Sequence, residues 1–195
     1  MQKHNLYIVV TRTNTFLGKL IQFFKKDEYT HAAISLDKRL NHMYSFGRKY
    51  AFIPFIGVFK HEEVNTGLNK YQKEIPGVII ELEVTKEQYE KATALIAQFI
   101  SNSKKYKYNY RGLYHGLFNR EACSDYRFLC SEFVYYILKE SGIIDFKLPR
   151  NLVRPQTFLD LEGRVIFKGN IKDIHPRGRG YQLLFPNNKR RIINM

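Results

Sequence analysis

The chain has 195 residues, of which 44% are hydrophobic, 26% charged and 15% aromatic. These proportions exclude a disordered or collagen-like chain and indicate a globular protein with a substantial core. The 32 Lys and Arg exceed the 18 Asp and Glu, for a formal net charge of +14, which indicates either an anionic partner or a solvated basic surface.

Taken in chain order, Leu6–Val10 is a β-branched apolar run and predicts a strand. It is too short for a signal-peptide core. Asn14 is placed to cap a helix whose apolar positions recur at helical spacing up to Lys25 and Lys26. The next strand, 30–36, alternates, with His31 on one face together with two small residues, Ala33 and Ser35.

A turn at 37–41 and a strand at 42–46 complete a hairpin that Gly47 closes. The longest apolar run, 50–59, is interrupted by Pro54 and Gly57 and therefore does not predict a membrane span. The two cysteines of the chain are too few for an extracellular disulfide framework. We therefore expect a soluble, cytoplasmic protein.

The second half begins with a strand at 78–84 and a helix that Thr85 and Gln88 cap reciprocally. A helix is predicted over Phe128–Ser141, ending at Gly142. Two further strands are predicted near 164–167 and 181–185.

These elements form an α+β pattern. We expect a single domain over residues 1–195, with a core at about 5–168 and a C-terminal extension at 169–195. No repeat and no linker rich in Gly, Pro or Ser divides the sequence.

Cys130 falls in the first turn of the helix predicted over 128–141. The unpaired N–H groups and positive end of a helix favour thiolate over thiol, and the same groups stabilise an oxyanion. Cys130 is therefore the candidate nucleophile. The alternative is a buried structural cysteine, the common state of free cysteines.

A cysteine nucleophile needs an imidazole within hydrogen-bond reach. Of the six histidines, His31 alone stands at the head of a well-alternating strand, and its small neighbours on that face leave room for a helix to approach. The alternative for His31 is a histidine satisfied at a strand end. We find no spacing of His and Cys typical of a zinc site, and we expect no metal and no cofactor.

Two segments resemble a known family. Tyr29–Leu36 is similar to the histidine strand, and Leu129–Val134 to the Cys-Ser-Glu helix, of the circularly permuted NlpC-type papain-like hydrolases, in particular the YiiX/YebB-like group. The histidine precedes the cysteine, as in that family. The stretch Tyr106–Tyr110 also resembles the family's Tyr-Asp stretch, with Asn109 at the acidic position.

The resemblance covers roughly residues 5–160 and implies a permuted papain-like fold, with a central antiparallel sheet or barrel packed on helices. It implies a cysteine amidase, peptidase or esterase, or an acyltransferase, that forms an acyl-enzyme with a peptide-like or lipid-like substrate. An orienting residue for the histidine is expected on the following strand, where Tyr44 and Ser45 stand. Glu62 or Glu63 would serve if the chain folds back.

For substrate binding the candidates are Tyr108, Tyr110 and Ser131. The alternative for the tyrosines is a loop that covers the core. The apolar segment 52–59 would form either a groove wall or core, and Cys123 is expected to be a bystander.

Two non-enzymatic functions stay open. One is a binding module on the same fold. The other is a basic protein that binds an anionic membrane surface or nucleic acid, of which nucleic acid is disfavoured because no polybasic block is present.

Overall fold

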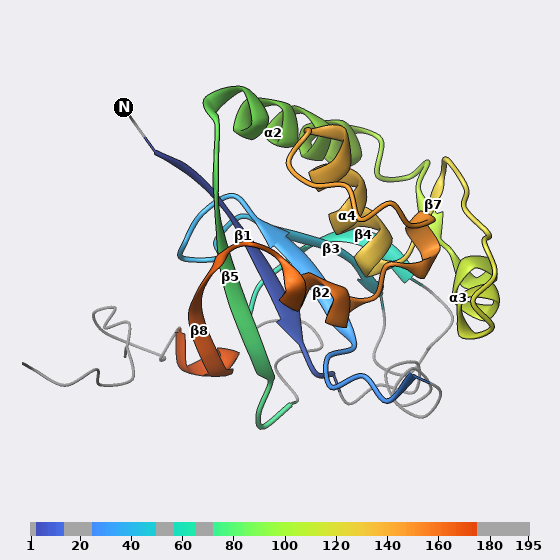
Figure 1. The fold of residues 1–195 in the computed structure, drawn as a ribbon, viewed down its shortest axis with the longest axis horizontal. Coiled ribbons are helices and arrows are strands. Elements are labelled where there is room, and N and C mark those ends of the chain that lie inside the picture. Colours follow the sequence, from blue (N-terminus) through green and yellow to red (C-terminus); the bar gives the residue numbers. More distant parts are fainter. Residues whose placement is uncertain (1–2, 14–24, 50–56, 65–71, 175–195) are drawn as a thin grey trace, which may run out of the picture.

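The computed structural model describes residues 3–13, 25–49, 57–64 and 72–174, and their centre is a six-stranded antiparallel sheet with strand order β4-β3-β2-β1-β5-β8 (Figure 1). Its strands are β1 (His4–Thr11), β2 (His31–Ser35), β3 (Met43–Arg48), β4 (Gly57–Glu62), β5 (Pro76–Val84) and β8 (Arg164–Asn170). The sheet is open, with β4 and β8 at its edges. The chain is therefore α+β. Its strands form an open sheet and not the closed barrel that was the alternative expectation.

Two helices, α2 (Lys86–Ser101) and α4 (Cys130–Glu140), lie over one face of the sheet, and α3 (Tyr110–Leu117) lies beyond its end (Figure 1). The short strands β6 (Lys107–Tyr108) and β7 (Arg127–Phe128) pair in parallel before α3 and α4. Three 3₁₀ turns follow: η2 (Arg150–Leu152), η3 (Pro155–Asp160) and η4 (Ile171–Ile174). Among the described residues, no helix is both long and apolar enough to cross a membrane.

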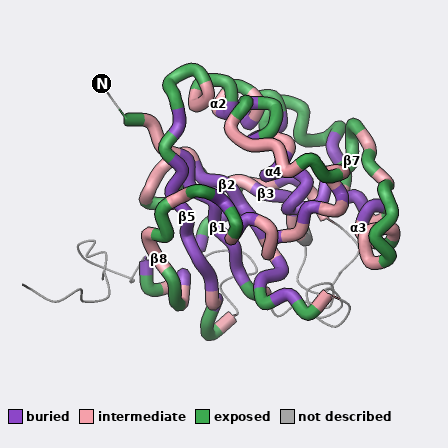
Figure 2. Tube along the Cα trace, in the orientation of Figure 1, coloured by how far each residue is buried: buried purple, intermediate pink, exposed green. Residues whose placement is uncertain are grey.

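Both faces of the central strands are buried (Figure 2). In β1, Ile8 and Val10 belong to the core beneath the helices, whereas Tyr7 and Val9 belong to a second cluster with Ile171 of η4. The helix-side core contains an aromatic group whose rings contact one another: Phe46, Phe59, Phe99, Phe128 and Phe133. Because each such ring contributes roughly 1.5–3 kcal/mol when buried, this group anchors α2 and α4 on the sheet.

Most predicted elements are confirmed within a residue or two of their ends. The capping box of α2 is present, with Gln88 N–H donating to Thr85 Oγ1 at 3.1 Å and Thr85 N–H donating to Gln88 Oε1 at 2.9 Å. The packed chain continues past 168, since β8 ends at Asn170 and Ile174 is buried. The helix predicted after Asn14 and the strand predicted at 181–185 lie outside the described residues.

The expectation that a helix would approach β2 over its small residues on the His31 face is wrong. Ala33 belongs to the cluster with η4, whereas Ala32 and Ile34 belong to the core beneath α4. Alternation along a strand separates two faces, but it does not say which of them a helix will cover.

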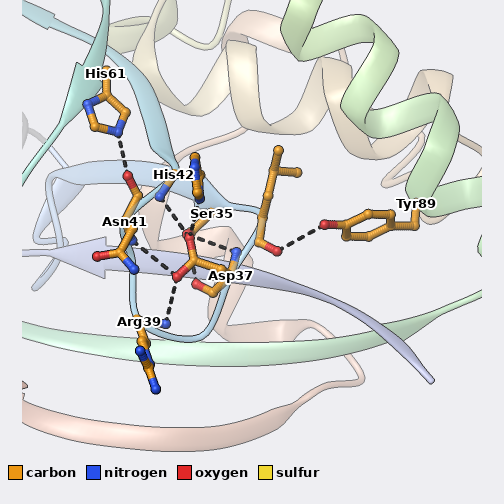
Figure 3. Close-up of polar contacts among 8 residues, drawn as sticks. Ser35, Asp37, Arg39, Asn41, His42, His61 and Tyr89 are labelled. Carbon is orange, nitrogen blue, oxygen red and sulfur yellow. Dashed lines mark hydrogen bonds and ion pairs between the residues drawn. The ribbon is translucent and has the colours of Figure 1, made fainter. Parts of the chain in front are cut away.

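The turn between β2 and β3 is organised by one carboxylate (Figure 3). Asp37 Oδ1 accepts from the N–H groups of Arg39 and Asn41 at 2.9 and 3.2 Å, and Oδ2 accepts from that of His42 at 2.8 Å. Although burial alone would raise it, these bonds hold the pKa of Asp37 below its usual range. The Tyr89 hydroxyl donates to Leu36 O at 3.2 Å, which ties the turn to α2.

We expect Asp37→Ala to lower the free energy of unfolding by about 1–3 kcal/mol, because three backbone donors lose their acceptor. Asp37→Asn keeps one acceptor oxygen and should fall between Asp37→Ala and the parent protein in a urea titration. Lys38→Ala, in the same turn, is the control and should change little. Equal stability of Asp37→Ala and the control would show that the carboxylate does not organise the turn.

Candidate active site

Cys130 is the first residue of α4, and its side chain is buried, at 7% relative exposure. The helix start is fixed by Glu132, whose Oε2 accepts from Leu129 N–H at 2.7 Å. The N–H groups of the first turn have no partner inside a helix. The sulfur therefore lies at the positive end of α4, beside donors suited to an oxyanion.

His31 is the first residue of β2, and its ring contacts Glu62 and interacts with Cys130. Its Nε2 is 3.0 and 3.2 Å from the two carboxylate oxygens of Glu62. Burial opposes protonation, but the charge of Glu62 and the hydrogen bond with Cys130 raise the pKa of His31 to about 10. The imidazole is therefore cationic at neutral pH.

Glu62, the last residue of β4, is the carboxylate that orients the histidine. It is 6% exposed, and it also accepts from Ser45 Oγ at 2.5 Å and pairs with Lys60 Nζ at 3.2 Å. Burial would raise the pKa of Glu62, but His31 and Lys60 hold it well below its usual range. A Cβ at Gly47 would lie 2.8 Å from Lys60 Cε, so glycine makes room for the lysine across β3.

The two residues considered on the strand after His31 have different environments. Ser45 Oγ lies 3.4 Å from His31 Nε2 and supports the site through Glu62. Tyr44 points to the opposite face, as alternation requires, and stacks on Phe59 at 6.0 Å between ring centroids. Tyr44 as the orienting residue is therefore corrected: the structure places Glu62 in that position, through the fold-back of β4 on β3.

The tyrosines proposed for substrate binding pack where β6 meets β4. Tyr108 and Tyr110 contact each other, with ring centroids 4.8 Å apart. A Cβ at Gly57 would lie 2.3 Å from the Tyr108 ring, so the two chain segments touch there. The role of these tyrosines in substrate binding stays a prediction.

Ser131 lines a cavity of about 60 Å³ between α3, α4 and η2. Leu129 lines the same cavity, so the residues on both sides of Cys130 face it. Its other apolar side chains are Leu113, Leu117, Leu152, Val153 and Pro155, and its other polar ones are Lys25, Asn119, Asn151 and Arg154.

Sequence reasoning missed the residues that hold the cysteine helix in place. Glu132 has no exposed surface, and Asn109 Nδ2 donates to its two carboxylate oxygens at 3.0 and 3.1 Å. Asn109 Oδ1 accepts from Gly112 N–H at 2.8 Å and caps α3. Two features of the sequence could have indicated these contacts: an asparagine directly before a helix and a glutamate at the third helical position, both typical of helix caps.

The burial of Glu132 favours an amide over an acid at position 109. Burial raises the pKa of Glu132 to about 7, against the lowering effects of Leu129 N–H and the Arg150 charge. A carboxylate at 109 would place two acids in contact, and they cannot both ionise. Asn109 instead supplies a donor.

No family model, curated protein or solved structure matches this chain. The argument about its function therefore stands on the geometry of the site.

We expect Glu62→Gln to lower the pKa of His31 from about 10 toward its ordinary 6.5, since the carboxylate charge that does most to raise it is removed while burial still lowers it. His31 stabilises the pair below pH 6.5 and loses this effect as pH rises through about 10, whereas Glu62 stabilises it above pH 4.5 and loses this as pH falls. The parent protein should therefore be more stable than Glu62→Gln chiefly between pH 4.5 and about 10, where both members of the ion pair contribute. Ring proton NMR and urea unfolding across this range measure both effects.

The matched control for this change is Glu63→Gln, at the adjacent exposed position. It should leave the His31 titration unchanged. An unshifted His31 titration in Glu62→Gln would contradict the ion pair.

Asn109→Asp should destabilise the protein by about 1–3 kcal/mol, increasingly as pH rises from 4.5 through about 7. The reason is that a carboxyl with a raised pKa in the folded state loses stability in that interval. Gln98→Glu, at an exposed position of α2, adds a carboxyl group without a buried neighbour. If both variants showed the same pH dependence in thermal unfolding, the Asn109–Glu132 contact would not matter.

Proposed function

We propose that this protein is a thiol hydrolase of the permuted papain-like type, which cleaves an amide or ester through a Cys130 acyl-enzyme. The observation that supports the proposal is that His31 pairs with a buried carboxylate at 3.0 Å and also interacts with the cysteine that begins α4. A base held by a carboxylate next to a thiol at a helix start is the arrangement of an activated nucleophile.

The proposed reaction has two stages. Cys130 Sγ attacks the carbonyl carbon of the substrate, and the first-turn N–H groups of α4 donate to the oxyanion that forms. His31 gives its proton to the leaving amine or alcohol as the carbon–heteroatom bond breaks. The neutral imidazole then removes a proton from water, which attacks the thioester and releases the acid and the thiolate.

Each neighbour of His31 supports one part of this cycle. Glu62 fixes the ring and stabilises the imidazolium, and Ser45 holds Glu62 in turn. The buried site also keeps the pair away from bulk water, which strengthens its electrostatics.

The cavity that Leu129 and Ser131 line is the proposed site for the acyl part of the substrate. Leu129 and Ser131, which line it, flank Cys130 in the sequence, and neither Cys130 nor His31 itself lines it. Its volume of about 60 Å³ fits a small aliphatic group, and its wall combines apolar residues with polar ones that include Lys25 and Arg154.

The two cysteines of the chain give a matched test. Cys123 is exposed and Cys130 is buried, so exposure alone predicts faster alkylation of Cys123 by iodoacetamide. We expect the reverse at neutral pH, because the imidazolium and the helix end activate Cys130. Intact-protein and peptide mass spectrometry follow both sites.

With p-nitrophenyl acetate, Cys123→Ala should keep a burst of p-nitrophenol, and Cys130→Ala should lose it. If Cys130 reacts no faster than Cys123 in the folded protein, the site is not activated. That result would favour a binding module on the same fold.

A further inference from the structure

A second hollow, of about 690 Å³, lies on the other side of Asn109 from the cysteine helix. Its walls are the start of α3 with Tyr110 and Arg111, the segment 122–127, and Arg150 of η2. In Figure 1 these elements, α3 and β7 among them, lie together at one end of the molecule. The volume is in the range of small-molecule sites, and neither Cys130 nor His31 lines it.

The lining of this cleft is strongly cationic. Three arginines line it, Arg111, Arg127 and Arg150, against one acid, Asp125. Lys105 extends the positive charge at the rim, with Nζ 4.4 Å from the centre of the Tyr126 ring. Several like charges that converge on one hollow, in a chain of net charge +14, attract an anion by their summed field.

Arg150 is held in place before any ligand binds. Its guanidinium lies 4.4 Å from the centre of the Phe128 ring, and Nη2 donates to Ser124 O at 2.6 Å. Glu132, an acid that its charge reaches, is fully buried and does not line the cleft. A fixed guanidinium loses little freedom when it binds a phosphoryl or carboxylate group, which it matches with paired donors.

The backbone adds to this field. Asn109, Tyr110 and Arg111 form the N-terminal turn of α3, and all three line the cleft. The positive end of a helix favours anions.

We propose that this cleft binds a small anionic ligand through a phosphoryl or carboxylate group, held by Arg111, Arg127 and Arg150. The site is separate from the thiol site, and its existence does not depend on the hydrolase proposal. Asn109 lines the cleft and also bonds Glu132 in the first turn of α4, so one side chain connects the cleft to the helix that begins with Cys130.

The test uses the full chain and two series of probes, inorganic phosphate with pyrophosphate, and acetate with glutarate, in buffer of fixed ionic strength. Binding is followed by amide NMR shifts, which locate the ligand. We expect shifts concentrated at 109–111, 122–127 and 150, and the stronger series identifies the group that the cleft prefers.

Two charge-matched variants decide the assignment. Arg111→Ser/Arg127→Ser removes two exposed charges of the cleft, and Lys91→Ser/Lys168→Ser removes two exposed charges elsewhere. The cleft variant should weaken binding about tenfold or more, as expected for lost charge-assisted hydrogen bonds, and the control should stay within about twofold.

Equal weakening by both variants, shifts spread over the whole surface, or no shift at all would overturn the proposal. Repeating the titration with Cys130→Ala distinguishes the two proposals. The anion should still bind in the cleft of this variant, although the proposed nucleophile is absent. Arg150 is left unchanged, since it packs on Phe128 and its loss would disturb the fold.

Discussion

The buried pair of His31 and Glu62 is the interaction on which the rest of the site depends. The two residues lie on β2 and β4, which are not neighbours, so β3 must hold both strands in register. A buried charge without a partner costs several kcal/mol, and each member of the pair therefore requires the other. Ser45 and Lys60 both contact Oε1 of the carboxylate, which holds it in place beside the ring.

The cysteine reaches this pair through a separate set of contacts. The aromatic group under α2 and α4 fixes the helix on the sheet, and Glu132 with Asn109 fixes where the helix begins. The site is thus the meeting point of two units, a three-stranded part of the sheet and a capped helix. Neither unit contains both reacting groups, so the chemistry belongs to the packed domain.

The positive charges of the chain are also unevenly distributed in space, which the composition alone does not show. Lys60 pairs with Glu62 inside the candidate active site. Three arginines, by contrast, line a hollow that has a single acid in its lining: Arg111, Arg127 and Arg150. A net charge describes the whole chain, but binding depends on where charges lie relative to low-dielectric walls.

The sequence by itself determined the local features: the alternating strands, the reciprocal cap of α2, the hairpin after His31, and a cysteine at a helix start. Each follows from residues within one or two turns of each other, where periodicity and capping act. Only the tertiary structure decided that Glu62, and not Tyr44, orients His31, that α4 covers the Ala32 face, and that Asn109 holds Glu132. These depend on contacts between residues 23 or 31 positions apart or more, which packing selects and local sequence does not specify.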